Sequence, residues 1–252
     1  MRYVTIDARG DVAVLTVARP PANALNLELL ADGIAALAEL EADPPAAVVL
    51  TGSGRFFCSG ADLREVPDLP PDDQARMARG VNELFAGWHG FPRPLVCAVN
   101  GHAVAGGLIL ALCGDYRVGA ASGRYGLTEV KVGIPYPSEA IRVVQAELAP
   151  PAARRLVLLG ELFDAATAAG FGIFDEVLAD DDVLPRAIEV AEQFAALPPR
   201  TFEIVKQQLR AGQPARERGA FGGAAAAGFA SSEAPAAARA VLDAPKGVST
   251  TG

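Results

Sequence analysis

Hydrophobic and polar positions follow two different periods along the chain, and the period changes near residue 135. Before that point, short apolar runs typical of strands alternate with segments of helical spacing. The pattern predicts strands at 2–7, 11–17, 47–51, 95–99, 115–118 and 125–127. It predicts helices at about 27–40, at 73–88 and from about 105. Strands that alternate with helices indicate stacked βαβ units of the α/β class.

Past residue 135 the spacing of apolar positions is almost entirely helical. Helices are predicted at about 138–149, 151–160, 164–170, 183–196 and 199–211. An alanine-rich segment predicts a last helix that starts after residue 216 and ends near 243. We expect this C-terminal third to form a separate layer or a lid over the α/β part.

The stretch LVCAVNGHAVAGGLILALCG, residues 95–114, is almost free of charge. It is long enough for a membrane span, but Asn100, His102 and the glycines argue against one. It reads better as a buried strand, a turn and a buried helix. Gly106 and Gly107 fall where that helix would begin, so their N–H groups lack intrahelical partners and favour an anionic oxygen.

Composition and charge are those of a globular protein. The chain has 252 residues, of which 51% are hydrophobic and 21% charged, and its net charge of −8 argues against nucleic-acid or anionic-membrane partners. Cys58, Cys97 and Cys113 stand in apolar runs and are interpreted as reduced, buried thiols. The first 17 residues alternate and contain acids, unlike a signal peptide. We therefore expect a soluble, cytoplasmic protein.

Common cofactor motifs are missing from the sequence. It has two histidines, no Cys-x-x-Cys, no Walker phosphate loop, no G-x-G-x-x-G and no G-x-S-x-G elbow. We therefore expect no metal and no separate cofactor. His102 and His89 are interpreted as structural, and Asp115 and Arg117 as a local ion pair.

Two glycine-bearing turns carry the candidate chemistry. One is Cys58-Ser59-Gly60-Ala61-Asp62, and the other is Ala105-Gly106-Gly107. Each is expected to follow a strand and open a helix, with Asp62 and Glu65 as a cap and brace for the first. Paired N–H donors aimed at one oxygen are what a thioester carbonyl needs when it becomes an enolate.

In this order and spacing, RFFCSGADL, AVNGHAVAGGLILALCGDYRV and YGLTEVKVGI resemble the crotonase (enoyl-CoA hydratase/isomerase) superfamily. The resemblance is good to about residue 135 and looser through FDAATAAGFGIFDEVL. It implies a spiral of ββα turns over 1–195 that holds an acyl-CoA site. It also implies a helical region over 196–252 that serves as a lid or in assembly. A homotrimer or dimer of trimers is the implied assembly.

Carried over to this sequence, the resemblance assigns roles to particular residues. The oxyanion donors would be the N–H groups of Ser59 and Gly106, and the acid/base would be Glu129. The ligand would be acyl-coenzyme A, with the CoA moiety contacted by Ala24, Ser59, Gly60, Ala61, Asp62, Leu63 and Gly106. Arg64 and Lys246 are candidates to hold its phosphates.

One departure from the family pattern points to the reaction. The family's hydratases use two glutamates, which fall here at positions 109 and 129, and position 109 is Ile. Ile109 can neither accept nor donate a proton, so the sequence resembles the Δ3,Δ2-enoyl-CoA isomerases, which need one base. The alternatives are a hydratase or other single-glutamate acyl-CoA enzyme, and a non-catalytic acyl-CoA-binding protein.

Overall fold

The computed structural model describes residues 1–211. Its strands are β1 Val4–Arg9, β2 Val12–Val17, β3 Ala47–Gly52, β4 Phe56–Cys58, β5 Leu95–Val99, β6 His102–Val104, β7 Tyr116–Ala120, β8 Tyr125–Gly126 and β9 Glu176–Leu178. Its helices are α1 Leu27–Ala42, α2 Pro71–Gly90, α3 Gly106–Leu112, α4 Ser138–Glu147, α5 Pro150–Leu159, α6 Ala165–Gly170, α7 Asp180–Ala195 and α8 Pro199–Ala211. Two 3₁₀ turns, η1 Val66–Asp68 and η2 Glu129–Val132, complete the described elements.

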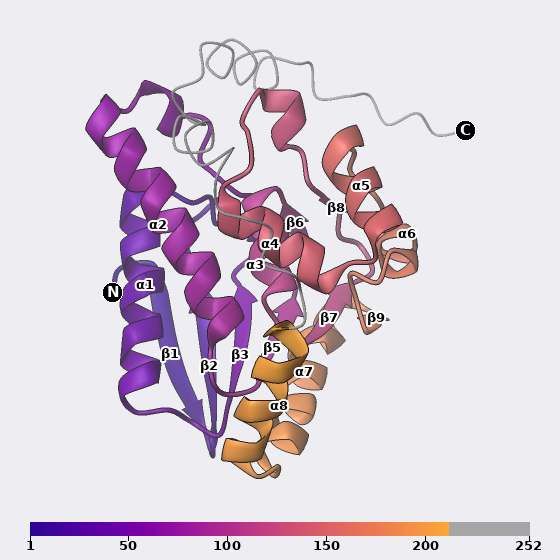
Figure 1. Cartoon of the computed structure of the whole chain (residues 1–252). Coiled ribbons are helices and arrows are strands. Elements are labelled where there is room, and N and C mark those ends of the chain that lie inside the picture. The colour runs from indigo at the N-terminus through magenta and orange to yellow at the C-terminus, as the bar shows by residue number, and fades with distance from the viewer. Residues whose placement is uncertain (212–252) are drawn as a thin grey trace.

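The strands form two sheets that the chain visits in alternation (Figure 1). The larger sheet has the order β1-β2-β3-β5-β7-β9, and the smaller one has the order β4-β6-β8. β1 pairs antiparallel with β2, and all other neighbours are parallel. Each pass through β3-β4, β5-β6 or β7-β8 therefore adds one strand to each sheet. This repeated step is the spiral expected from the sequence, and the α/β class is confirmed.

The central strands of the larger sheet, β2, β3, β5 and β7, are buried on both faces, as apolar parallel strands require. One face packs on α7 through alternate strand residues, among them Val49, Val96 and Val118. The other face, with Leu50 and Cys97, joins the main core beneath α1, α2 and α3. The predicted positions of most elements are confirmed, but β4, β6 and β9 were not predicted as strands.

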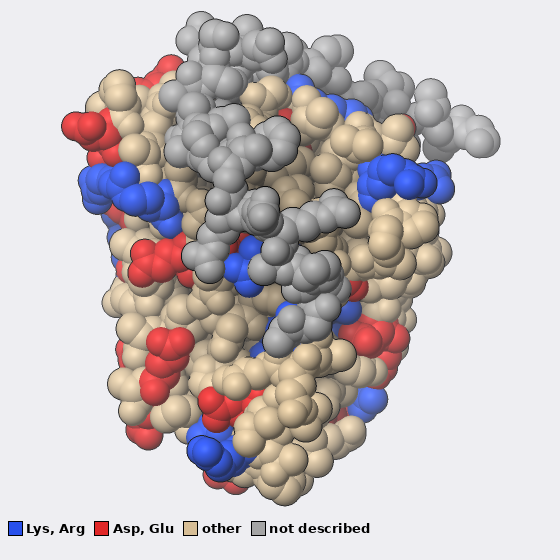
Figure 2. All heavy atoms as spheres, viewed as in Figure 1, with Lys and Arg blue, Asp and Glu red and all other residues tan. Residues whose placement is uncertain are grey.

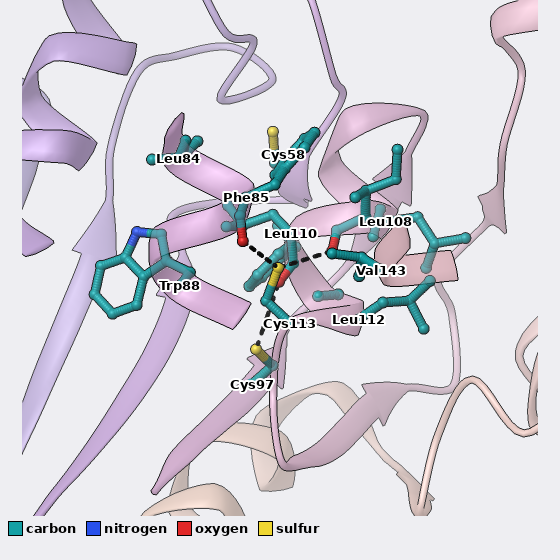
Figure 3. Close-up of a cluster of buried hydrophobic side chains, with 14 of the residues drawn as sticks. Cys58, Leu84, Phe85, Trp88, Cys97, Leu108, Leu110, Leu112, Cys113 and Val143 are labelled. Atoms are coloured by element: carbon teal, nitrogen blue, oxygen red, sulfur yellow. Dashed lines mark hydrogen bonds between the residues drawn. The ribbon is translucent and has the colours of Figure 1, made fainter. Parts of the chain in front are cut away.

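The three cysteines are free, buried thiols within this core, as predicted. Cys113 at the end of α3 donates to the carbonyl oxygens of Ile109 (3.4 Å) and Phe85 (3.7 Å), which ties α3 to α2 (Figure 3). Burial raises the pKa of Cys58 and that of Cys97 to about 12. These thiols therefore act as packing groups at neutral pH.

A cluster of buried charges fixes helix α8 to the rest of the chain. Asp115 accepts from Lys206 at 2.6 Å and from Arg210 at 3.0 Å, and Lys206 is only 7% exposed. The predicted Asp115–Arg117 pair is wrong, because Arg117 instead binds Glu147 at 3.0 Å. Both arrangements join residues far apart in the chain, which local spacing does not reveal.

The surface of the described residues carries both signs of charge. On the face shown in Figure 2, acidic and basic side chains lie in small separate groups between uncharged ones. Within the described part of the chain, no helix is long and apolar enough to cross a membrane. The predicted helix between about 216 and 243, most of the predicted 196–252 region and Lys246 lie outside the described residues.

Candidate active site

A cavity of about 470 Å³ lies where the two glycine turns meet η2 and helix α2. Its wall is mostly apolar and combines six separate parts of the chain. The lining residues are Leu25, Ser59, Ala61, Leu63, Val81, Phe85, Val104, Ala105, Gly106, Ile109, Thr128, Glu129, Lys131, Val132, Ile134, Pro137, Gly160 and Leu162. A pocket of this size with few polar groups is typical of a small-molecule site.

The first turn offers a free N–H group, but at Ala61 rather than at Ser59. The Ser59 N–H donates to the Ala22 carbonyl oxygen at 3.1 Å, so it is already engaged. Leu25 and Ala61 form a parallel bridge. In it the Leu25 N–H donates to the Gly60 carbonyl oxygen at 2.7 Å, and the Asp62 N–H donates to the Leu25 carbonyl oxygen at 2.9 Å.

Leu25 thus makes both hydrogen bonds of the bridge, to the residues on either side of Ala61, and the Ala61 N–H points away from Leu25. The Ala61 N–H makes no hydrogen bond to the described residues, and Ala61 lines the cavity. The Ser59 N–H is therefore not free to act as the predicted donor, whereas the Ala61 N–H is. Ser59 itself still lies on the cavity wall.

The second turn offers the N–H of Gly106 at the first position of α3. Ala105 precedes it with φ 53°, a left-handed conformation that is strained for a residue with a Cβ. This backbone turns the chain from β6 into α3, and the Gly106 N–H has no partner within the described residues. Strain of this kind is commonly found at functional sites.

The two turns are packed directly on one another, and glycine makes this possible. A Cβ on Gly107 would lie 2.0 Å from the Cys58 carbonyl oxygen. A Cβ on Gly60 would lie 3.0 Å from the Gly106 nitrogen. The close approach brings the Ala61 and Gly106 N–H groups to the same part of the cavity wall, as two donors for one oxygen would require.

Ile109 and Glu129 complete the part of the wall that bears on chemistry. Ile109 lies one turn into α3 and is 1% exposed, so the wall here is aliphatic. Glu129 begins η2 and is 7% exposed. Burial raises the pKa of Glu129 from 4.5 to about 7. A carboxyl group with this pKa can both take up and release a proton near neutral pH.

The residues predicted to contact coenzyme A are only partly brought to the cavity. Ser59, Ala61, Leu63 and Gly106 line it, whereas Ala24, Gly60 and Asp62 do not. Ala24 and Asp62 are instead held by Arg19, which donates to the Asp62 carboxylate at 2.7 Å and to the Ala24 carbonyl oxygen at 3.0 Å.

Asp62 and Glu65 do not cap an α-helix, which corrects that prediction. Asp62 accepts the N–H of Arg64 in a tight turn, and Arg19 pairs with Glu65 at 2.5 Å. The element that directly follows Glu65 is the 3₁₀ turn η1 and not an α-helix. Arg64 is exposed and does not line the cavity.

Both histidines have structural surroundings, as predicted. His102 accepts the N–H of Arg124 through Nδ1 at 2.9 Å and packs edge-on against Phe56. His89 Nε2 lies 2.9 Å from Glu147. Among the described residues, no group of three or more His, Cys, Asp or Glu side chains could hold a metal ion.

Comparisons with known proteins show the family of the chain. A family model described as enoyl-CoA hydratase/isomerase matches residues 7–225. The protein called probable enoyl-CoA hydratase EchA17 of Mycobacterium tuberculosis is 32% identical over 209 residues, which are 82% of this chain and 80% of that protein. Human mitochondrial enoyl-CoA delta isomerase 1 is 34% identical over 208 residues, 81% of this chain and 69% of that protein.

Solved structures agree with the sequence matches. The crystal structure of human mitochondrial Δ3-Δ2-enoyl-CoA isomerase superposes with a TM-score of 0.87 at 29% identity, covering 96% of this chain and 97% of that one. The crystal structure of the probable enoyl-CoA hydratase EchA3 of M. tuberculosis superposes with a TM-score of 0.79 at 28% identity. The match covers 95% of this chain and 94% of that one.

The fold is therefore the α/β crotonase fold, with two sheets and C-terminal helices. The chain belongs to the enoyl-CoA hydratase/isomerase family, a family of acyl-CoA enzymes. Hydratase and isomerase relatives match at similar identity, so the reaction has to be argued from the site.

Proposed function

We propose that this chain moves the double bond of a 3-enoyl-CoA to the 2-enoyl position. Glu129 acts as the single acid/base, and the N–H groups of Ala61 and Gly106 hold the thioester oxygen. The observation that carries the proposal is the composition of the cavity wall. Among the described residues that line it, Glu129 is the one carboxylate. Ile109 also lines it, at the position where the family resemblance expects the other glutamate of the hydratases.

The proposed reaction needs one base because the same proton can leave and return. The ionised Glu129 carboxylate takes a proton from C2, which lies between the thioester carbonyl and the C3–C4 double bond. The C2–H electrons form the C1–C2 double bond of a dienolate, and the carbonyl electrons move onto the thioester oxygen. When the carbonyl re-forms, the C1–C2 electrons move to form the C2–C3 double bond. The C3–C4 electrons then take the proton back at C4, and Glu129 is ionised again. No water is consumed, and no second carboxylate is required.

The main contribution to the energy barrier of this step is the formation of negative charge on the thioester oxygen. Two N–H groups fixed in a mostly apolar wall are suited to hold it, and loss of one such donor costs about 3–4 kcal/mol of barrier. The donors belong to two backbone turns that are tightly packed on each other, so little rearrangement is needed when the enolate forms.

Hydration is the second candidate, because relatives named as hydratases match this chain as well as an isomerase does. Adding water across a 2-enoyl thioester requires activation of the water and protonation of C2. The side chain of Ile109 supplies neither function. Contacts of coenzyme A with the first turn, a trimeric or hexameric assembly and a cytoplasmic location stay predictions.

A paired assay separates the candidates. Purified wild-type protein and the Glu129→Gln variant are each given a 3-enoyl-CoA and a 2-enoyl-CoA in water. The proposal expects rapid formation of 2-enoyl-CoA, slow hydration, and a loss of at least about 10²-fold in the variant. Faster hydration than isomerisation would contradict it and favour a hydratase. Tight binding of acyl-CoA with neither reaction would favour a binding protein.

A further inference from the structure

Two buried oxygen atoms beside the cavity lack hydrogen-bond partners. They are Oε2 of Glu129 and the hydroxyl oxygen of Tyr136, and neither finds a partner among the described residues. Buried polar atoms are nearly always hydrogen-bonded, so an unpaired one calls for a physical reason. Here one atom is a carboxylate acceptor, and the other belongs to an O–H group that can donate.

The two side chains lie close to one another. The Tyr136 hydroxyl lowers the pKa of Glu129 against the larger effect of burial, and the Glu129 carboxylate raises the pKa of Tyr136. The hydroxyl also lies near the main-chain N–H of Glu129. The pair is thus within interaction range but is not aligned as a hydrogen bond.

The backbone between the two residues explains why they meet. Gly133, with φ 67°, ends η2 in the left-handed conformation, and the N–H of Ile134 returns to the carbonyl of Glu129 at 3.1 Å. Tyr136 follows between Pro135 and Pro137, whose rings restrict the chain as it enters α4. The Tyr136 ring packs against the main core, so its hydroxyl has a fixed approach.

We propose that Tyr136 is a positioning residue for Glu129. Its hydroxyl donates to Oε2 when the carboxylate is ionised, and this holds the other carboxylate oxygen toward the substrate. Tyr136 is not part of the cavity wall, so it acts through Glu129 rather than on the substrate. The inference rests on the proposed function, in which Glu129 is the base.

The described residues of the cavity wall include one charged side chain besides Glu129. Among the described residues of the cavity wall, Lys131 is the one cation, and it is exposed. Tyr136 is the side chain whose interaction moves the pKa of Glu129, apart from burial and the main chain. Removal of its hydroxyl should therefore be read directly in the titration of Glu129.

The test compares wild type with Tyr136→Phe, which keeps the packed ring and removes only the hydroxyl. Protein labelled with ¹³C at the glutamate carboxyl carbons is titrated by NMR, and Glu129→Gln identifies the Glu129 signal. The matched control is Tyr116→Phe, because the Tyr116 hydroxyl binds Glu176 at 2.7 Å and does not line the cavity.

If Tyr136 positions Glu129, Tyr136→Phe raises the pKa of Glu129 and Tyr116→Phe leaves it unchanged. At pH 7, kcat for the 3-enoyl-CoA falls by about 10- to 100-fold, as expected for a hydrogen bond to a charged group, and KM changes by less than about 2-fold. Replacement of Tyr136 by 3,5-difluorotyrosine, which keeps the ring and makes a stronger donor, lowers the pKa instead.

An unchanged Glu129 titration in both Tyr136 variants overturns the proposal, and so does a rise in KM with kcat unaltered. The titration needs no substrate, so it is independent of the reaction. A shifted pKa in a protein that does not isomerise 3-enoyl-CoA would support the Tyr136–Glu129 pair and contradict the proposed function alone.

Discussion

Ile109 of helix α3 and Glu129 of the turn η2 line the same cavity, and both are almost fully buried. The pair places an aliphatic surface where a second proton-transfer group could stand. It leaves Glu129 in apolar surroundings, which raise the pKa of its carboxyl group to about 7. The expected chemistry of the site follows from this relationship.

Ile109→Glu should add hydratase activity. A second carboxyl group on α3 could protonate C2 or orient a water, so hydration of 2-enoyl-CoA should rise by about 10-fold or more. The measurement is the loss of absorbance of the conjugated 2-enoyl thioester. Ile109→Gln is the control, since the glutamine side chain has nearly the shape of glutamate but transfers no proton. Equal hydration rates in the two folded variants would contradict the assigned role of position 109.

Glu129 should make folding stability fall as the pH rises. Its pKa is 4.5 when unfolded and about 7 in the folded chain, so the folded state binds more protons between these values. Stability from this group is complete below pH 4.5 and is lost as the pH passes through about 7. The shift corresponds to roughly 3 kcal/mol.

Glu129→Gln has no charge to bury and should therefore be more stable than wild type at pH 8, by up to that amount. The difference should shrink toward pH 5, as measured by urea unfolding at both pH values. Glu83→Gln, at an exposed position of α2, should change stability by less than about 0.5 kcal/mol. If the Glu129→Gln variant is no more stable than wild type at pH 8, burial of the ionised Glu129 carboxylate does not destabilise the folded state.

Gly107→Ala should damage the oxyanion site. The added Cβ would meet the Cys58 carbonyl, which is backbone and cannot move aside cheaply, so the two turns must separate. Loss of one N–H contact should lower kcat for isomerisation by about 10²- to 10³-fold. Gly90→Ala at the end of α2 is the control, because a Cβ at that position would have no other group within 4 Å. Wild-type kcat in Gly107→Ala would exclude this packing as the source of the donor geometry.

Asp115→Ala should loosen α8. The substitution leaves Lys206 and Arg210 without their shared carboxylate, and breaking a buried pair costs about 3–5 kcal/mol. Arg142→Ala removes a pair whose arginine is 70% exposed and should cost less than about 1 kcal/mol. Urea unfolding of both variants measures the contrast, and similar small losses would mean that the cluster does not hold α8.

The hydrophobic pattern predicted most strands of the larger sheet and most helices, because those elements are long enough to show a period. The strands β4 and β6 have only three residues each, too few for alternation to be recognised. Strand β9 is equally short and stands among helices. The smaller sheet therefore became visible only in the structure.

The candidate site was predicted in outline through family resemblance, and its errors share one cause. Whether Ser59 or Ala61 has the free N–H depends on how this turn pairs with Ala22 and Leu25, a contact that spacing does not encode. The partner of Asp115 is likewise 91 residues away, at Lys206. Contacts between distant segments decide such details, and a single sequence does not display them.

The most direct test of the single-base account follows a labelled proton. A 3-enoyl-CoA carrying deuterium at C2 is converted in ordinary water, and the 2-enoyl-CoA product is analysed for deuterium at C4 in short reactions. If Glu129 alone carries the proton, part of the label reappears at C4, and Glu129→Gln forms almost no product. Product formed rapidly by Glu129→Gln, or wild-type product with only solvent hydrogen at C4 at the earliest times, would contradict the account.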